Sequence, residues 1–237
     1  MKKIIVCCLT LCMCLCFSRL SFAADAKKVA EKGLVAYWSF DEGKGEVVKD
    51  KSGNDNEGEI IEAEWVKGKV GNALKFNGST SYISIAHSDS LIPDVFTIEA
   101  WINPESLSGT DRGPMILSKY GGNWHGYMLL IEGSSGCPSM HIDTQDSEIG
   151  AGSDTALVEG KWYFIVGTYD GKTAKFYVNG ELKESAEAEL TQDEGIALTI
   201  GKASWCEQAF FTGIIDEVKI YNRVLSEKEI KDQVEVK

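Results

Sequence analysis

The stretch Trp162-Tyr-Phe-Ile-Val-Gly-Thr-Tyr169, followed by Asp170-Gly171, Thr173-Ala-Lys-Phe-Tyr-Val178 and Asn179-Gly180, decides the fold class of this chain. Both longer runs are rich in β-branched and aromatic residues, which favour strands. Asp-Gly and Asn-Gly are the preferred residues of two-residue hairpin turns, because both central positions need positive φ. The stretch therefore predicts two strands, a turn at 170–171 and a second turn at 179–180.

The remainder of the chain continues this β pattern. Phe96-Thr-Ile-Glu-Ala-Trp-Ile102 alternates between apolar and polar residues, and Trp101 on its polar face indicates that both faces are partly covered. Further strands are expected at 34–40, 82–86, 115–118, 127–131, 140–142, 196–201 and 213–221, and residues 71–78 lead into another. Residues 43–59 are rich in turn formers and predict a structured loop. Many short strands with Gly-rich turns predict an all-β sandwich or jelly roll.

The C-terminal end carries the clearest helix signal of the chain. Ser226-Glu-Lys-Glu229 is a capping-box pattern and predicts a short C-terminal helix. No long amphipathic helix and no tandem repeat are present in the sequence.

The N-terminal end has the composition of an export signal. Lys2 and Lys3 precede an apolar run, and Ser21-Phe22-Ala23 fits a cleavage site, so we expect a signal peptide over 1–23, a polar leader over 24–32 and one domain over 33–237. An uncleaved membrane anchor is the alternative, although the run is short for one.

The charge of the chain excludes some partners. Removal of residues 1–23 takes away Lys2, Lys3 and Arg19 but no acid, so the net charge of −12 becomes −15. Such a surface repels phosphate backbones and anionic lipids. We therefore expect neither a nucleic-acid partner nor membrane insertion after signal cleavage.

Two cysteines, Cys137 and Cys206, lie outside the signal segment. In an exported protein they would most simply form one disulfide. Two unpaired thiols are the alternative.

Several motifs, in this order, carry a family resemblance. They are Gly33-Leu-Val-Ala-Tyr-Trp-Ser-Phe-Asp-Glu42, Asp50-Lys-Ser-Gly-Asn54, Gly71-Asn-Ala-Leu-Lys-Phe-Asn-Gly78, Phe96-Thr-Ile-Glu-Ala-Trp101, Gly167-Thr-Tyr-Asp-Gly171, Phe176-Tyr-Val-Asn-Gly180 and Ile215-Asp-Glu-Val-Lys-Ile-Tyr-Asn-Arg223. Together the motifs resemble the laminin-G-like jelly-roll domains of the concanavalin A-like lectin/glucanase superfamily. The resemblance covers about residues 33–231 and implies a two-sheet antiparallel jelly-roll sandwich. It also implies a secreted binding module, frequently for glycans, and often a structural calcium ion.

The resemblance places Asp41, after the first strand, close to Asp216 in the last strand. A carboxylate beside core residues needs a partner, because an unpaired buried charge is costly. We therefore expect a structural calcium ion at Asp41 and Asp216, with backbone oxygens near Asn77 and Gly78 as helpers. The loop from Asp50 to Asn56 offers further oxygens, and its alternative is a turn in which the side chains cap their own backbone.

A sugar site needs an exposed aromatic ring beside polar groups. Two tryptophans fall in expected loops, Trp124 and Trp205, and the expected rim is completed by Tyr120, Asn123, His125 and Gln208. If Cys137 pairs with Cys206, the disulfide would hold the Trp205 loop against residues 133–152. The alternative is that these tryptophans only cover a sheet edge or the disulfide.

The sequence leaves three functions open. The first is a non-catalytic carbohydrate-binding module, whose ligand is a glycan or a cell-surface molecule. The second is a protein-binding or adhesion module, which an exposed apolar patch around Phe210 and Phe211 would favour. The third is a glycan-cleaving enzyme using Asp143, Asp146 or Glu148, but their spacing does not put all three on one strand face. A solvated acidic loop is the simpler interpretation of these acids, so we expect no enzyme.

Overall fold

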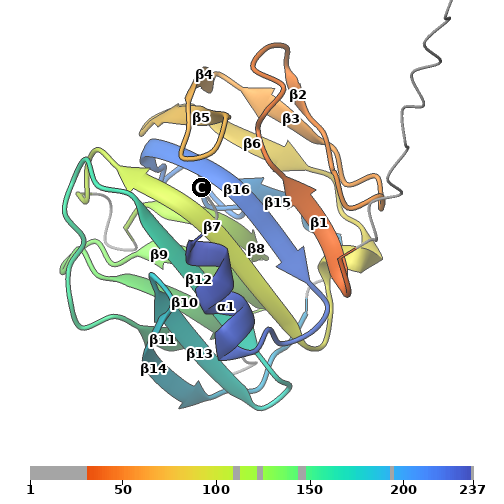
Figure 1. Cartoon of the computed structure of the whole chain (residues 1–237), viewed down its shortest axis with the longest axis vertical. Coiled ribbons are helices and arrows are strands. Elements are labelled where there is room, and N and C mark those ends of the chain that lie inside the picture. The colour runs from red at the N-terminus through yellow and green to blue at the C-terminus, as the bar shows by residue number, and fades with distance from the viewer. Residues whose placement is uncertain (1–30, 109–112, 122–124, 144–147, 193–194, 236–237) are drawn as a thin grey trace, which may run out of the picture.

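The computed structural model describes residues 31–108, 113–121, 125–143, 148–192 and 195–235 and shows a sandwich of two antiparallel sheets (Figure 1). The front sheet consists of β1 (Leu34–Trp38), β4 (Glu64–Lys67), β5 (Asn72–Asn77), β7 (Phe96–Pro104), β12 (Tyr163–Tyr169), β13 (Thr173–Val178), β14 (Glu181–Glu187) and β16 (Thr212–Tyr221). The back sheet consists of β2 (Val47–Val48), β3 (Gly58–Ile61), β6 (Tyr82–Ile85), β8 (Met115–Tyr120), β9 (Gly126–Ile131), β10 (Pro138–Asp143), β11 (Glu148–Gly152) and β15 (Leu198–Ile200). A 3-10 turn (Asp89–Leu91) and one helix, α1 (Glu227–Val234), complete the described elements. The predicted all-β sandwich of two antiparallel sheets with a short C-terminal helix is confirmed.

Strand order explains how the two ends of the domain meet. The front sheet runs β14-β13-β12-β7-β16-β5-β4, and β1 also pairs with β16. The back sheet runs β11-β10-β9-β8-β15-β6-β3-β2. Because β1 joins β16 in antiparallel register, with Trp38 opposite Val218, the first and last strands lie side by side.

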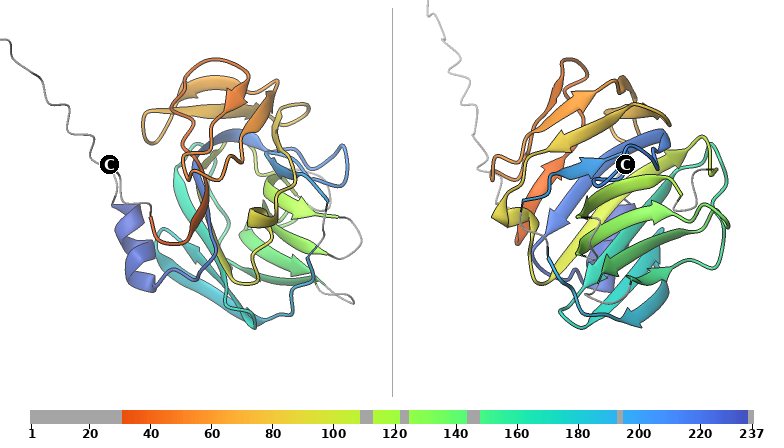
Figure 2. Two further views of the ribbon diagram at one scale, coloured as in Figure 1. Left: turned by 90° about the vertical axis from the view of Figure 1, so that its right-hand side faces the viewer. Right: turned by 180° about the vertical axis from the view of Figure 1, so that it is seen from behind.

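Three apolar layers follow from the strand alternation. The main core lies between the sheets and includes Trp38, Phe76 and Phe176, all fully buried. A second cluster, including Trp101 and Phe164, fills the space between the front sheet and α1, which lies on the outer side of that sheet (Figure 2, left). Both faces of the strand that carries Trp101 are therefore covered, as its sequence predicted. The third cluster lies on the outer face of the back sheet.

The hairpin prediction holds, with one shift of the turn. Asp170 N–H donates to Thr173 O at 3.2 Å, so Gly171 and Lys172 form the centre of the turn. Asp170 was predicted at the centre of the turn, but it lies before the centre and caps the turn, because its Oδ1 accepts the N–H groups of Lys172 and Thr173. The second turn is as predicted, with Asn179 and Gly180 at φ of 50° and 80°.

Other segments differ from the expectations. The predicted loop at 43–59 contains β2 and the start of β3, which pair through Val47 and Glu59. The predicted signal peptide and most of the leader lie outside the described residues. No helix among the described residues is long and apolar enough to cross a bilayer.

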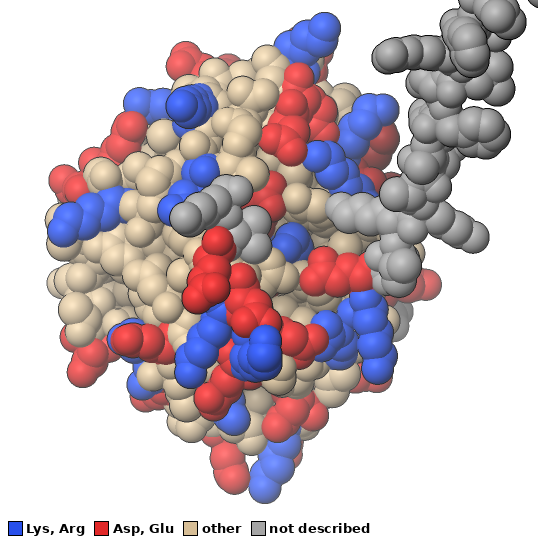
Figure 3. Space-filling view, in the orientation of Figure 1, with Lys and Arg blue, Asp and Glu red and all other residues tan. Residues whose placement is uncertain are grey.

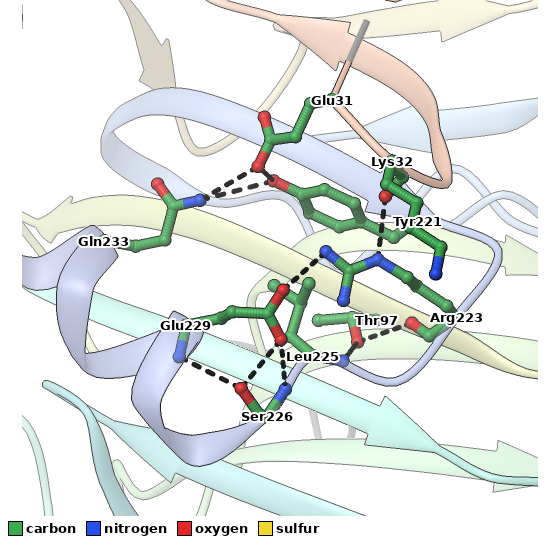
Figure 4. Close-up of polar contacts among 9 residues, drawn as sticks. All are labelled: Glu31, Lys32, Thr97, Tyr221, Arg223, Leu225, Ser226, Glu229 and Gln233. Carbon is green, nitrogen blue, oxygen red and sulfur yellow. Dashed lines mark hydrogen bonds and ion pairs between the residues drawn. The ribbon is translucent and has the colours of Figure 1, made fainter.

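The predicted capping box anchors α1 to the rest of the domain (Figure 4). Ser226 N–H donates to Glu229 Oε2 at 2.8 Å, and Glu229 N–H donates to Ser226 Oγ at 3.3 Å. Arg223 Nη2 lies 2.8 Å from Glu229 Oε1, and Arg223 Nε donates to Lys32 O at 2.7 Å. The guanidinium of Arg223, together with Ser226, lowers the pKa of Glu229 to about 2.

The network predicts a pH-dependent contribution of Glu229 to stability. Its folded pKa lies below the ordinary value of 4.5, so its contribution is present above pH 4.5 and is lost as the pH falls toward 2. We expect Glu229→Gln to lower the free energy of unfolding at pH 7 by roughly 1 kcal/mol, since the carboxylate is half-exposed and screened. Urea unfolding at pH 7 and pH 2.5 measures this.

Glu227→Gln is the control, because it removes a carboxylate of the same helical turn that lies outside this network. An equal loss of stability in both variants, or the same loss at both pH values, would contradict the account.

Candidate functional site

The outer face of the back sheet carries a loop that folds over it. This loop, residues 202–211, is called the Trp205 loop. Ser204 fixes it to β8, because Ser204 Oγ lies 2.8 Å from Ser118 Oγ and accepts Tyr120 N–H at 3.0 Å. At the other end of the loop, Met115 N–H donates to Ala209 O at 3.0 Å. The loop is thus held at both ends of β8.

Trp205 rests on an aromatic support within this loop. Its ring meets Tyr120 edge-on, with 4.5 Å between ring centroids and 85° between planes. The surrounding apolar cluster is formed by Met115, Tyr120, Met128, Leu130, Ala203 and Ala209. Tyr120 is only 2% exposed, whereas Trp205 is half-buried. Trp205 can therefore present part of its ring to a ligand, but Tyr120 can act only from beneath.

A polar groove lies beside this cluster on the same face, over β10 and β11, which are seen from behind in Figure 2 (right). Its volume is about 240 Å³. The groove is lined by Glu132, Ser135, Cys137, Ser139, His141, Gly150, Gly152, Ser153 and Glu184. We call it the back groove. It offers hydroxyl, imidazole and carboxylate groups to a ligand.

Glu132 organises one wall of the back groove. Its Oε1 accepts Ser139 Oγ–H at 2.6 Å and lies 2.7 Å from His141 Nε2. On the opposite wall, Glu184 Oε2 accepts Gly152 N–H at 2.8 Å. These bonds hold the side chains in fixed directions, which a selective polar site requires.

Two glycines keep the floor of the groove open. A Cβ at Gly150 would lie 2.9 Å from His141 Nε2, and one at Gly152 would lie 2.9 Å from Ser139 Cβ. Any larger residue would therefore displace the wall or fill the groove.

The structure brings together part of the predicted sugar rim. Trp205 and Tyr120 touch, and Gln208 is exposed on the Trp205 loop. His125 lies at the turn between β8 and β9, where its carbonyl accepts Gly121 N–H at 3.1 Å. Asn123 and Trp124 lie outside the described residues.

Sequence reasoning missed the walls of the back groove. Alternation along β10 carries the signal, because Met140 and Ile142 face the core and so direct Ser139 and His141 outward. The catalytic hypothesis cannot be compared with the structure, because Asp146 lies outside the described residues and the side chains of Asp143 and Glu148 are not described.

The predicted disulfide is not formed, because Cys137 and Cys206 are both free. Cys137 lies next to β10, where its Sγ is directed at Ser135 O, 4.0 Å away. Cys206 instead packs with the apolar cluster under the Trp205 loop. Ser204, rather than a disulfide, ties this loop to the sheet.

The predicted calcium ligands divide into two groups. Asp41 and Asp216 flank the same turn, residues 68–71: Asp216 Oδ2 accepts Val70 N–H at 3.0 Å, and Asp41 Oδ1 accepts Asn72 N–H at 3.4 Å. Asn77 instead pairs with Thr212, near the start of β16, and its Oδ1 caps the turn at 79–81. Asn77 lies three residues along β5 from Leu74, which pairs with Ile215, and Gly78 lies one residue beyond the end of β5.

Asp216 has the chemistry of a ligand with one position open. Its side chain is fully buried, and Oδ1 has no hydrogen-bond partner among the described residues. Burial, partly offset by Val70 N–H, raises the pKa of Asp216 to about 7. Asp41 is more exposed and is paired with Lys51 at 3.0 Å. The orphaned oxygen of Asp216 fits a metal ion, but the described residues contain no group of three acidic, histidine or cysteine side chains placed to hold one.

The loop at 50–56 is a self-capped turn. Asp50 Oδ1 accepts the N–H groups of Tyr37 and Ser52, and Oδ2 accepts Ser52 Oγ–H and Asn56 N–H. These oxygens already have donors, so the capping interpretation accounts for this loop.

Comparison with known proteins places the chain in a family. A laminin G sequence model, described as the concanavalin A-like lectin/glucanases superfamily, matches residues 77–231. The mouse pentraxin-related protein PTX3 is 30% identical over 130 residues, which are 49% of this chain and 33% of PTX3. This chain thus spans about a third of that relative.

Solved structures share the fold at low identity. Domain 4 of AbnA, a GH43 extracellular arabinanase from Geobacillus stearothermophilus in complex with arabinotriose, has a TM-score of 0.71 and 22% identity, covering 86% of this chain and all of that one. The binding domain of Paraclostridial Mosquitocidal Protein 1 has a TM-score of 0.69 and 19% identity, covering 85% and 52%. The receptor-binding domain of botulinum neurotoxin C/D mosaic serotype has a TM-score of 0.68 and 18% identity, covering 86% and 51%. Together with the two-sheet sandwich, the family match shows that this chain belongs to the concanavalin A-like lectin/glucanases superfamily.

Proposed function

We propose that this protein is an exported, non-catalytic carbohydrate-binding module whose sugar site is the back groove together with Trp205. The observation that carries the proposal is the pairing of an oriented polar wall, Glu132 with Ser139 and His141, with a half-buried indole on the same sheet face. Sugars need both, because their apolar ring face stacks on an aromatic ring while their hydroxyls need directional partners.

The charges of the groove favour neutral sugars. Glu132 and Glu184 face it, and a carboxylate accepts hydrogen bonds from sugar hydroxyls strongly. An anionic sugar would instead be repelled by these groups and by the net charge of the chain. The fold likeness to a domain in complex with arabinotriose makes arabinose oligosaccharides the first ligands to try.

The alternative function, a protein-binding or adhesion module, lacks the exposed apolar patch that would favour it. An adhesion patch around Phe210 and Phe211 would require both rings at the surface, but Phe211 is fully buried. Phe210 packs toward Tyr82, with 6.5 Å between ring centroids. The catalytic alternative rested on Asp143, Asp146 and Glu148, whose side chains lie outside the described part of the structure, so release of reducing ends from a glycan is the measurement that decides it.

Binding of arabinotriose and of neutral oligosaccharides to the protein, measured by calorimetry, tests this proposal. We expect Trp205→Ala to weaken binding about three- to tenfold through lost stacking. Glu132→Gln should weaken it roughly tenfold, since a charged hydrogen bond becomes a neutral one.

His87→Ala is the matched control for His141→Ala, because His87 is also half-buried but lies in the segment after β6, away from the groove. Binding that is lost equally in both histidine variants would place the sugar elsewhere. The release of reducing ends would show that the module is an enzyme.

We also propose that a calcium ion binds at Asp216 Oδ1, beside the turn at 68–71, and stabilises the contact between the two ends of the domain. Calcium takes six to eight oxygens, so Asp216 and Asp41 would need backbone carbonyls and water to complete its shell. The unpartnered, buried Oδ1 supports the proposal, since a cation would compensate its charge.

Thermal unfolding in calcium and in chelator tests the calcium site. An ion that binds only the folded state raises the melting temperature, and the rise grows with the concentration of the ion. We expect a rise with calcium that Asp216→Asn abolishes and Asp94→Asn, on an exposed loop, leaves intact. An unchanged melting temperature in the native protein would reject the site.

A further inference from the structure

The outer face of the front sheet contains a cavity that neither proposal uses. It lies beside α1, on the face shown in Figure 3, and has a volume of about 160 Å³. The cavity is lined by Glu31, Tyr37, Val70, Glu99, Trp101, Phe164, Glu217, Lys219 and Gln233. We call it the front cavity. Its lining residues range from Glu31, which is exposed, to Glu99, which is 1% exposed. The front cavity therefore extends from a residue at the surface to a buried carboxylate.

Glu99 leaves one buried oxygen without a partner. Its Oε1 lies 2.9 Å from Lys219 Nζ, but Oε2 has no hydrogen-bond partner among the described residues. A buried carboxylate oxygen without a donor is costly, and native proteins rarely leave one unsatisfied. Since Glu99 lines the front cavity, the lining contains a carboxylate that lacks one donor.

The cavity also has an excess of negative charge. Glu31, Glu99 and Glu217 line it, against Lys219 as the one cationic lining side chain. Two of these acids have donors: Tyr37 Oη donates to Glu217 Oε2 at 2.9 Å, and Tyr221 Oη donates to Glu31 Oε1 at 2.9 Å (Figure 4). Burial raises the pKa of Glu99, the charge of Lys219 opposes this, and Glu31 and Glu217 raise it further.

The uncharged part of the lining is mixed, with polar Gln233 and the ring of Tyr37 beside three apolar side chains. Val70, Trp101 and Phe164 line one side, with 5.2 Å between the ring centroids of Trp101 and Phe164. Lys69 Nζ lies 4.5 Å from the ring centroid of Trp101, so a second positive charge lies beside this wall, against three carboxylates. The walls suit the methylene groups of a ligand whose charge lies elsewhere.

We propose that the front cavity binds a small primary alkylamine, with the ammonium group at Glu99 Oε2 and the alkyl chain against Trp101 and Phe164. The three carboxylates exclude anions. A neutral polyol would leave the charge excess uncompensated. A metal ion lacks a suitable group of three ligands among the described residues. The volume equals that of about five water molecules in the liquid, so the ligand is short.

Titration of the protein with 1,4-diaminobutane at low ionic strength, followed by calorimetry, tests the proposal. The matched neutral compound is 1,4-butanediol, which has the same chain without charge. We expect the diamine to bind and the diol not to bind. Equal binding of both compounds, or no heat from the diamine, would overturn the proposal and leave the cavity to water.

Two variants test the location of the amine. Glu99→Gln should abolish binding, but it also disturbs a buried ion pair and could unfold the protein. Glu31→Gln changes an exposed residue, and we expect it to weaken binding roughly three- to fivefold. Glu184→Gln, on the edge strand β14 of the same sheet and facing the back groove, is the control and should leave amine binding unchanged. An equal loss in Glu31→Gln and Glu184→Gln would show a non-specific charge effect and overturn the assignment.

Discussion

The pairing of β16 with three other strands is the constraint on which the structure depends. On one side it pairs with β7 along most of its length; on the other it pairs first with β5, through residues 212–215, and then with β1, through residues 218–221. The change of partner coincides with a register shift between Asp216 and Lys219, where Glu217 has a φ of 52°. A β-bulge bends its strand and redirects side chains. This bulge thus joins the last strand to the first.

The same bulge places the acids of the front sheet. A left-handed conformation is unfavourable for a residue with a side chain, by about 1–2 kcal/mol. The hydrogen bonds from Tyr37 Oη to the Glu217 carboxylate stabilise it. On either side, Asp216 faces the turn at 68–71 and Lys219 pairs with Glu99. One backbone irregularity therefore creates both the orphaned oxygen of Asp216 and one wall of the front cavity.

Local patterns in the sequence predicted the parts of the fold that local chemistry determines. The hairpin at 162–178, the alternation that became β7 and the capping box of α1 all have short-range signals. The sequence did not predict β14, because nearly all of its residues are exposed and it packs only at a sheet edge. The strands β2 and β3 were not predicted either, because turn-forming residues surround them in the sequence. Such strands form because a neighbour offers hydrogen bonds, and that information is not local.

The candidate sites show the same limit. Trp205 was found from its place in an expected loop, whereas Glu132 was missed, because it meets Ser139 and His141 only across paired strands. Tyr120 was expected at the rim, but the Trp205 loop folds back over it and buries it. The disulfide was inferred from compartment and cysteine count, neither of which reports where Cys137 and Cys206 lie.

We propose that the two outer faces of the sandwich bind different ligands, with an uncharged sugar on the back sheet and cations on the front sheet. The most direct test of the sugar site is hydrogen–deuterium exchange of the protein with and without saturating arabinotriose. The account predicts slower exchange confined to residues 126–153 and to the Trp205 loop. Protection that appears instead around α1 and the turn at 68–71, with the back groove unchanged, would contradict it.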